Sequence, residues 1–359
     1  MNKIRVLMIG PARTVKGGMT TVVNNYFNYG LSNKVKLEYI ETINDGNKIS
    51  KFFKEIIGII KYKKQINNYD IVHIHMASRR STFRKCKYIK IAKKKDKRII
   101  VHIHGGGFRD FYENECNQNK KNKIRKYLNS ADKIIVLSKE WKEFFRKIVN
   151  IEKITIIENG TPIQNDFNKD IDNKKILYLG RINREKGIYV LLDAATILIE
   201  KFPNINIRIG GDGEIKKIEE YIIKRNLSNN VTLLGWLDET NKEKELKEST
   251  YFILPSYYEG MPMSLIEAMA HKCISIATNV GGVPEVIKNK ENGFIITPGN
   301  KQHIVKTFEL CFENRKIRHK ISENARVTIS KKFNIENNIN KTFNIYKNMM
   351  NVNKPFIDE

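Results

Sequence analysis

Two glutamates that stand eight residues apart, Glu259 and Glu267, bracket the segment of this chain most suited to chemistry. The segment reads Glu-Gly-Met-Pro-Met-Ser-Leu-Ile-Glu, so a loop with glycine and proline leads into a helix. The first N–H groups of a helix are free and partly positive, and we expect those of Met263, Ser264 and Leu265 to bind a diphosphate. Glu267 lies one helical turn further on, where a carboxylate can accept hydrogen bonds from ribose hydroxyls.

A second segment supplies positive charge. Residues 180–187 read Gly-Arg-Ile-Asn-Arg-Glu-Lys-Gly and follow a predicted strand at 175–179. Arg181 and Lys186 therefore stand at the carboxyl end of that strand. A guanidinium and an ammonium there suit a leaving diphosphate, whose developing charge must be neutralised.

The first third of the chain contributes two further candidates. Gly17 and Gly18 follow the first predicted strand and open a helix, and they let another molecule approach the backbone closely. His104 ends a strand and precedes three glycines, so we expect an exposed polar side chain at the carboxyl end of that strand. We interpret His102 as a core residue, and His73 and His75 as structural.

These candidates depend on short buried strands that alternate with helices. Strands are predicted at residues 4–9, 71–75, 99–103, 132–138, 154–157, 175–179, 205–209, 231–234, 251–254, 273–277 and 293–297. The pattern restarts after the polar stretch 164–173. Such alternation predicts parallel sheets with helices on both faces, and ligands at the carboxyl ends of the strands. We therefore expect an α/β chain of two doubly wound, Rossmann-like domains that face a cleft.

The chain resembles retaining glycosyltransferases of family 4, which have the GT-B architecture. The most specific part of the resemblance is the pair Glu259 and Glu267 with the residues between them. It is supported by Lys16-Gly17-Gly18, His104-Gly105, Asn159-Gly160, Gly180-Arg181, Lys186-Gly187, Gly281-Gly282-Val283-Pro284-Glu285 and Asn292-Gly293. The resemblance implies an acceptor domain at 1–165, a nucleotide-sugar domain at 166–333, and a last helix at 334–359 that crosses back to the first domain.

The resemblance also implies roles for the site residues. Glu267 would bind the ribose, while Arg181 and Lys186 would bind the diphosphate. Glu259 and His104 would lie beside the donor sugar, and Gly18 would back the reaction centre. Retention through a covalent intermediate needs a carboxylate nucleophile, and none can be identified from the sequence. The implied path is same-face attack, in which the leaving phosphate takes the proton of the acceptor.

No cofactor is expected beyond the donor substrate, for which a UDP-sugar is favoured. No metal is expected either. One Asp-x-Asp string, Asp170-Ile171-Asp172, falls in the predicted linker, and we do not interpret it as a metal site.

Positive charge is concentrated in the first half of the chain. The formal net charge is +26; residues 1–165 hold 35 Lys and Arg against 14 Asp and Glu, and residues 166–359 hold 30 against 25. Two lysine-rich stretches, 51–64 and 83–95, have two interpretations. In the first, their apolar residues pack on the core and their lysines are exposed to solvent. In the second, the stretches bind anionic lipid headgroups. No nucleic-acid-binding motif is present, and we favour a membrane surface as the partner over nucleic acid.

The amino-acid composition narrows the class of protein further. Hydrophobic residues make up 41% of the chain and charged residues 29%, which is typical of a globular protein. Four scattered cysteines without a Cys-x-x-Cys pair are typical of a reducing compartment. No apolar run approaches the roughly 20 residues of a membrane-spanning helix. We expect a cytoplasmic enzyme, peripherally bound at the inner face of the cell membrane, that extends a lipid-linked oligosaccharide for capsule, exopolysaccharide or O-antigen.

Two other functions stay open at this point. A nucleotide-sugar epimerase of the same architecture would keep the nucleotide site and turn over the sugar nucleotide without an acceptor. A non-catalytic protein that binds anionic surfaces would keep the fold and tolerate loss of Glu267.

Overall fold

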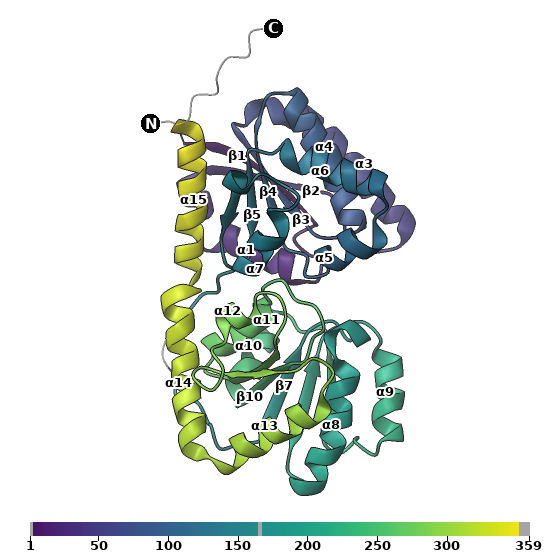
Figure 1. Ribbon diagram of the computed structural model, residues 1–359, viewed down its shortest axis with the longest axis vertical. Coiled ribbons are helices and arrows are strands. Elements are labelled where there is room, and N and C mark those ends of the chain that lie inside the picture. The colour runs from purple at the N-terminus through teal and green to yellow at the C-terminus, as the bar shows by residue number, and fades with distance from the viewer. Residues whose placement is uncertain (1–2, 164–166, 352–359) are drawn as a thin grey trace. The chain divides into compact units, whose positions relative to one another are not determined.

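The computed structural model describes residues 3–163 and 167–351, which fall into two compact units. Unit 1 comprises Met1–Gly160 together with Ile335–Glu359, and unit 2 comprises Thr161–Asn334 (Figure 1). The domain boundary expected between residues 165 and 166 lies outside the described residues. The last described helix, α15 (Ile335–Asn351), belongs to unit 1.

Unit 1 is built on a parallel sheet in the order β2-β1-β3-β4-β5-β6. Its strands are β1 (Arg5–Gly10), β2 (Lys36–Glu41), β3 (Ile71–Met76), β4 (Arg98–Ile103), β5 (Lys133–Val136) and β6 (Ile154–Ile156). The helices besides α15 are α1 (Gly18–Asn28), α2 (Leu31–Lys34), α3 (Lys48–Gln65), α4 (Arg80–Lys94), α5 (Phe108–Asp110), α6 (Gln118–Asn129) and α7 (Lys139–Phe145), with the short turns η1 (Ile66–Asn68), η2 (Phe111–Glu115) and η3 (Ile151–Lys153).

The two faces of this sheet differ in chemistry. On one face, Val72 and Ile74 of β3 pack with Ile89 of α4 in an apolar core. On the other face, the alternate residues of β3 are histidines. His73 lies beneath Tyr26 of α1 and Tyr346 of α15. The alternation follows from the strand period of two, which sends successive side chains to opposite faces.

Unit 2 repeats the plan with the parallel order β12-β11-β10-β7-β8-β9. Its strands are β7 (Lys175–Leu179), β8 (Asn206–Gly210), β9 (Val231–Gly235), β10 (Tyr251–Leu254), β11 (Ile274–Thr278) and β12 (Phe294–Ile296). Its helices are η4 (Arg184–Lys186), α8 (Ile188–Lys201), α9 (Ile215–Lys224), α10 (Glu239–Glu248), α11 (Met263–Ala270), α12 (Val283–Val286), α13 (Lys301–Glu313) and α14 (Arg315–Lys332).

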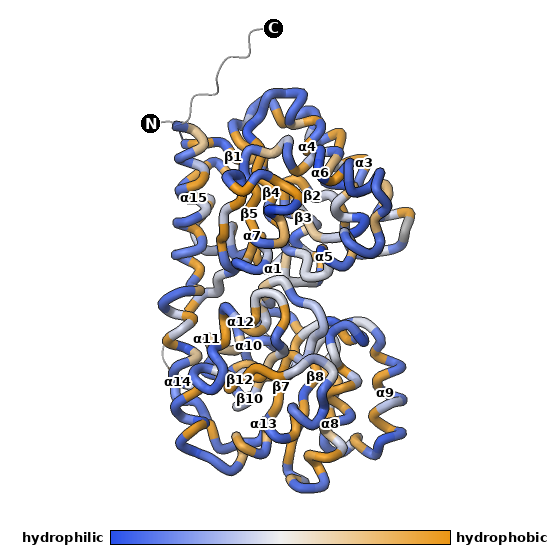
Figure 2. Tube along the Cα trace, in the orientation of Figure 1, coloured by the Kyte–Doolittle hydropathy of each residue, from blue (hydrophilic) through white to orange (hydrophobic). Residues whose placement is uncertain are grey.

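The core of unit 2 is apolar on the face covered by α8 and α13. Leu191 and Leu198 of α8 pack with Phe308 of α13 and with Ile176 and Tyr178 of β7. In each unit hydrophobic residues follow the strands, while hydrophilic residues are frequent on the outer helices (Figure 2). Two parallel sheets with flanking helices confirm the predicted α/β class with two doubly wound domains.

One strand was missing from the prediction. β2 forms the edge of the unit 1 sheet and pairs only with β1. Its sequence, Lys-Leu-Glu-Tyr-Ile-Glu, mixes charged and apolar residues, as an edge strand does, rather than forming a buried apolar run. The prediction had relied on such runs.

The two lysine-rich stretches also differ. In α4, Cys86, Ile89 and Ala92 are buried, so the core-facing interpretation of residues 83–95 is confirmed. In α3, Phe52 and Ile57 are exposed instead, so the core-facing interpretation of residues 51–64 is wrong. Within the described ranges, no helix combines the length and apolarity needed to cross a membrane.

Candidate active site

The site in unit 2 lies at the point where the order of the strands reverses. From β7 the chain proceeds outward through β8 and β9, and it then returns to β10 on the other side of β7. Loop 180–187 follows β7, and loop 255–262 follows β10. Ligands of doubly wound sheets bind at this switch point, at the carboxyl ends of the strands.

The two loops are held together by their backbones. Tyr257 N–H donates to the carbonyl oxygen of Glu185 at 2.9 Å. Gly187 adopts a positive φ of +72°, and a Cβ there would lie only 2.0 Å from the carbonyl oxygen of Pro255. Only glycine fits this approach, which explains the Lys186-Gly187 pair in the sequence.

Lys186 and Glu259 meet across the two loops. Lys186 Nζ lies 2.6 Å from Glu259 Oε1, and Ser256 Oγ donates to the same oxygen at 2.7 Å. Lys186 Nζ also donates to the carbonyl oxygen of Tyr258 at 3.3 Å. The carboxylate is 8% exposed, so its charge is compensated by one ammonium and one hydroxyl.

The start of α11 presents backbone amides. Pro262 occupies the N-cap position, and no side chain caps the helix. The side chains of Met263 and Leu265 are buried, and that of Ser264 is half-buried. With the side chains of Met263 and Leu265 packed inward, the N–H groups of the first turn and the hydroxyl of Ser264 are the polar groups that this end of the helix offers. Free N–H groups at the start of a helix are able to bind an anion, so the predicted diphosphate contact stays a prediction for these residues.

Glu267, one turn into α11, has its own cationic partner. Its Oε1 lies 2.8 Å from Nζ of Lys242 on α10, and the residue is 8% exposed. Sequence reasoning missed Lys242, because it lies 25 positions away in another helix and nothing local marks it. It also missed Ser256, whose position two residues after the end of β10 was a usable signal.

Arg181 differs from Lys186 in that its side chain is exposed. Its backbone is fixed, because Tyr178 Oη donates to its carbonyl oxygen at 2.8 Å. The structure thus brings Lys186 together with Glu259, and Glu267 together with Lys242. It places Arg181 at the start of the same loop as Lys186.

In unit 1 the predicted glycines begin the first helix. Gly17 is the N-cap residue of α1, has φ +139°, and has no atom within 4 Å of where a Cβ would stand. Gly18 is the first residue of α1. The backbone is therefore open on this side, at the carboxyl end of β1.

His104 is half-buried, not the exposed tip that the sequence suggested. It follows β4, and its ring centroid lies 4.1 Å from that of His102, with the two rings tilted by 33°. It stacks on the ring of His75 at an interplanar angle of 18°, and its Nε2 lies 2.8 Å from Nδ1 of His75. Burial lowers the pKa of His104 to about 3. The imidazole is therefore neutral near pH 7 and acts as a hydrogen-bonding group rather than as a cation.

The rings of His73, His75, His102 and His104 lie next to one another, and we call these four residues the histidine column. His73, His75 and His102 are fully buried, which confirms the structural interpretation. Ligating nitrogens of these three lie within 4.8 Å of one another. The rings of His73 and His75 are stacked at an interplanar angle of 15°, and those of His73 and His102 at 18°. In-plane lone pairs of stacked rings run side by side instead of converging on one point, which is poor geometry for a tetrahedral metal.

The Asp-x-Asp string is committed to structural contacts. Asp170 Oδ1 accepts from the N–H groups of Asp172 and Asn173. Asp172 pairs with Arg315 and Arg318. Both carboxylates therefore stabilise the fold of this segment.

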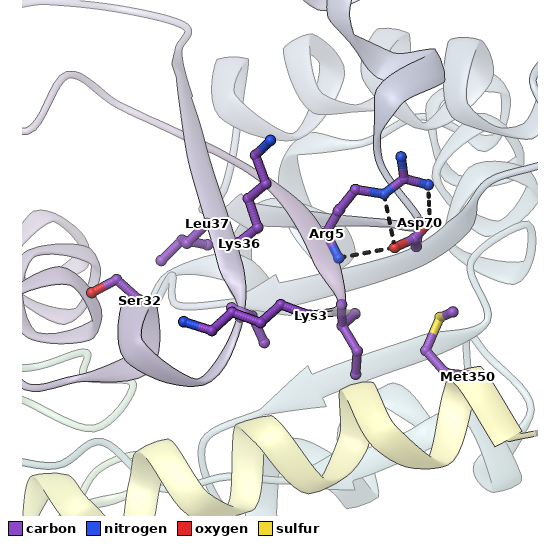
Figure 3. A pocket seen from close by; sticks show the side chains of 9 residues that line it. Lys3, Arg5, Ser32, Lys36, Leu37, Asp70 and Met350 are labelled. Atoms are coloured by element: carbon purple, nitrogen blue, oxygen red, sulfur yellow. Dashed lines mark hydrogen bonds and ion pairs between the residues drawn. The ribbon is translucent and has the colours of Figure 1, made fainter. Parts of the chain in front are cut away.

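A pocket of about 830 Å³ lies elsewhere on unit 1 (Figure 3). Lys3, Lys36 and Met350 line it together with Arg5 and Asp70, whose side chains pair at 2.7 Å. These residues stand at the amino ends of β1, β2 and β3 and on α15. Because ligands of such sheets bind at the carboxyl ends, we do not place the substrate in this pocket.

Comparisons with known families agree with this geometry. Residues 161–328 match the model described as Glycosyl transferases group 1, and residues 35–165 match Glycosyltransferase Family 4. The chain belongs to the GT-B glycosyltransferases of the family 4 type.

Two curated relatives illustrate the range of this family. An Escherichia coli UDP-Gal:alpha-D-GlcNAc-diphosphoundecaprenol alpha-1,3-galactosyltransferase is 28% identical over 90% of this chain and 86% of its own length. An uncharacterized glycosyltransferase of Methanocaldococcus jannaschii is 28% identical over 62% of each chain, so the match spans about three fifths of that relative.

Solved structures share the fold of this glycosyltransferase. Sucrose-phosphate synthase from Thermosynechococcus elongatus has a TM-score of 0.83 at 18% identity, over 97% of this chain and 99% of its own. Anabaena HepE, solved in complex with UDP-glucose, has a TM-score of 0.79 at 18% identity, over 96% and 99%. At such identities the likeness shows the GT-B fold.

Proposed function

We propose that this glycosyltransferase moves a sugar from a UDP-sugar to a hydroxyl of a lipid-linked saccharide, with retained anomeric configuration. The reaction belongs to the assembly of capsule, exopolysaccharide or O-antigen. One observation carries the proposal: Lys186 and Glu259 pair across the two loops at the strand reversal of unit 2, and the loop of Glu259 leads directly into the uncapped start of α11.

Donor binding follows from the contacts of these groups. A diphosphate carries more negative charge than a carboxylate and draws Lys186 toward it, with help from Arg181 and the amides of Met263, Ser264 and Leu265. Glu259 keeps the Ser256 hydroxyl on Oε1, and we assign Oε2 to a hydroxyl of the donor sugar. Glu267, oriented by Lys242 through Oε1, uses Oε2 for the ribose.

Transfer requires that negative charge on the leaving diphosphate be stabilised as the glycosidic bond breaks. Lys186 and Arg181 supply the positive charge from one loop, 180–187. In the same-face route the departing phosphate oxygen accepts the proton of the incoming hydroxyl, so no side chain serves as the base. The proposed chemistry uses neither a metal nor a cofactor.

His104 and the glycines belong to unit 1, to which we assign the acceptor. The neutral imidazole of His104 forms a hydrogen bond with a sugar hydroxyl without adding charge. Gly17 leaves room beside the first turn of α1, which begins at Gly18. The excess of basic residues in 1–165 favours an acceptor at an anionic surface, the inner face of the cell membrane, rather than nucleic acid.

Two relatives support the substrate classes. The E. coli relative is named for UDP-galactose and a diphosphoundecaprenol-linked acceptor, and Anabaena HepE was solved with UDP-glucose. Neither names the sugar or the linkage made by this chain.

A panel of UDP-, GDP- and other nucleotide sugars tests donor binding by thermal shift, since a ligand that binds the folded state raises the melting temperature. We expect UDP-sugars to give the largest shift. Incubation of the stabilising donor with a polyprenyl-diphosphate-linked saccharide then tests transfer. A glycosylated lipid product is expected; turnover of the donor alone would instead indicate an epimerase, and donor-independent vesicle binding alone a non-catalytic protein.

A further inference from the structure

Exposed apolar side chains are concentrated on α3. Among the described residues, fourteen large hydrophobic side chains are exposed, and six of them lie on this one helix. They are Ile49, Phe52, Phe53, Ile56, Ile57 and Ile60, with exposures between 39% and 66%. Their spacing of three and four residues places them on one side of the helix. We call these six residues the apolar stripe.

The orientation of α3 is fixed from the opposite side. A Cβ at Gly58 would lie 2.6 Å from the carbonyl oxygen of Glu41 and 2.9 Å from Tyr88 Oη, so the helix backbone presses against its neighbours there. Tyr62, one turn further on, is fully buried and donates to the carbonyl oxygen of Tyr88. With Gly58 and Tyr62 facing inward, the apolar stripe must face outward.

Charge around the stripe is positive. Lys61, Lys63 and Lys64 are exposed and follow the stripe at the carboxyl end of α3. Glu55, the one acidic residue of the helix, is turned toward α4, where it pairs with Arg84 at 3.1 Å and Lys87 at 2.6 Å. The exposed face of α3 therefore combines apolar and cationic groups without a carboxylate.

We propose that α3 lies in the interface of an anionic lipid bilayer, with the apolar stripe inserted at the boundary between headgroups and acyl chains. This inference rests on the proposed action at a membrane and names the residues that attach the chain there. Helices with apolar residues on one side and lysines at its margin bind in this way, since the lysine ammonium groups reach back to the phosphates. The attachment is then partly hydrophobic, not electrostatic alone.

A second copy of the chain fits this surface less well. Packing two apolar stripes against each other would cover them but would offer Lys61, Lys63 and Lys64 no carboxylate, because the exposed face of α3 carries none, and charge complementarity favours association. An anionic bilayer accepts the stripe and the lysines at once.

Vesicle flotation with a matched pair of variants tests the proposal. One variant carries Phe52→Ser, Phe53→Ser and Ile57→Ser; the control carries Ile151→Ser, Ile223→Ser and Val327→Ser, which are exposed hydrophobic residues elsewhere. Vesicles of phosphatidylglycerol with phosphatidylcholine are compared with pure phosphatidylcholine, at low salt and at about 1 M NaCl, where the Debye length is about 3 Å.

We expect the native chain and the control to bind the anionic vesicles, with part of the binding surviving high salt. The affinity of the stripe variant for the anionic vesicles should be lower by roughly tenfold or more, and high salt should release the protein that still binds. Equal binding by the stripe variant, or complete release of the native chain by salt, would overturn the proposal. So would a concentration-dependent dimer that the stripe variant abolishes, because it assigns the stripe to a second copy.

The thermal shift given by UDP separates this inference from the proposed function. Because the stripe lies in unit 1 and outside the predicted site, the stripe variant should keep the native shift. Loss of vesicle binding with a native UDP shift supports the inference alone, whereas failure of UDP to bind any variant counts against the proposed function alone.

Discussion

The two units of this glycosyltransferase share a sheet topology and differ in the chemistry at the carboxyl ends of their strands. In unit 2 these ends carry charge: the pairs of Lys186 with Glu259 and of Lys242 with Glu267, and the uncapped first turn of α11. In unit 1 they carry the histidine column, whose rings are neutral near pH 7, and an open glycine turn.

The difference indicates how one fold can serve two substrates. Under the proposed function a nucleoside diphosphate needs positive charge nearby, and unit 2 offers it through Arg181 and Lys186 of loop 180–187. A saccharide acceptor is uncharged at its reacting hydroxyl, and neutral hydrogen-bonding groups suit it better. Burial produces the neutral state in unit 1, since it holds the pKa of His73 and His104 at about 3.

The largest expected effect is on catalysis through Lys186. Lys186→Ala should lower kcat by about 10²–10³-fold, because it removes a cation that stabilises the leaving group. His104→Asn in unit 1 should cost about tenfold at most, since it changes a neutral hydrogen bond. Steady-state kinetics check both, with the exposed Lys217→Ala as the control. A greater loss from His104→Asn than from Lys186→Ala would reverse the assignment of the two units.

Next in size is an effect on donor binding through Glu267. Glu267→Gln keeps the shape of the side chain and removes its charge, so the affinity for UDP should fall about 10–100-fold. Isothermal titration calorimetry measures the change, and the exposed Glu219→Gln of α9 serves as the control. Unchanged affinity for UDP in Glu267→Gln would contradict the proposed contact between this carboxylate and the ribose.

Acid should destabilise unit 1 more steeply than unit 2. Burial lowers the pKa of all four histidines of the column, and in unit 2 it lowers that of His271. The unfolded chain then binds more protons, so stability is lost as pH falls below about 6.5, by roughly 1.4 kcal/mol per pH unit for each histidine.

Hydrogen exchange between pH 6.5 and 4.5 checks this prediction. In the folded chain the pKa values of the carboxylates of Glu41, Glu55 and Asp70 are lowered, so these groups titrate below that window and the histidines dominate the change in stability within it. His102→Leu removes two buried nitrogens for which the described residues offer no partner. The free energy of unfolding of this variant should therefore fall less steeply with acid. An equal slope in the two units would show that the column does not set the acid sensitivity.

The smallest expected effect concerns Lys242, a positioning residue for Glu267. Lys242→Met should raise KM for the donor by about twofold to fivefold with little change in kcat, the scale of one modest ion pair. Lys242→Arg should restore KM, because it keeps the cation. A change in melting temperature without a change in KM would mark Lys242 as structural only.

Much of the fold could be predicted because buried parallel strands are continuous apolar runs. β7 (Lys175–Leu179) and β10 (Tyr251–Leu254) were predicted at their observed ends. β2 was missed, because an edge strand mixes charged and apolar residues. The exposure of α3 could not be read from its periodicity, since the residue that turns the helix is Gly58, and its contact with Glu41 exists only in the folded chain.

The site was predictable where one segment carries it and not where partners come from elsewhere. Glu259 and Glu267 stand out because loop, helix start and carboxylates are consecutive. Lys242 comes from another helix, and the stacking of His75 on His104 joins two strands 29 residues apart. That stacking explains why His104 is half-buried and not an exposed tip.

The central claim is that unit 2 binds the diphosphate of the donor. Hydrogen exchange of the native chain with and without UDP tests it most directly, since each backbone amide reports separately. We predict slower exchange in residues 180–187 and at the amides of Met263, Ser264 and Leu265. Protection confined to the glycine turn and His104 of unit 1, with no change in those two segments, would contradict the account.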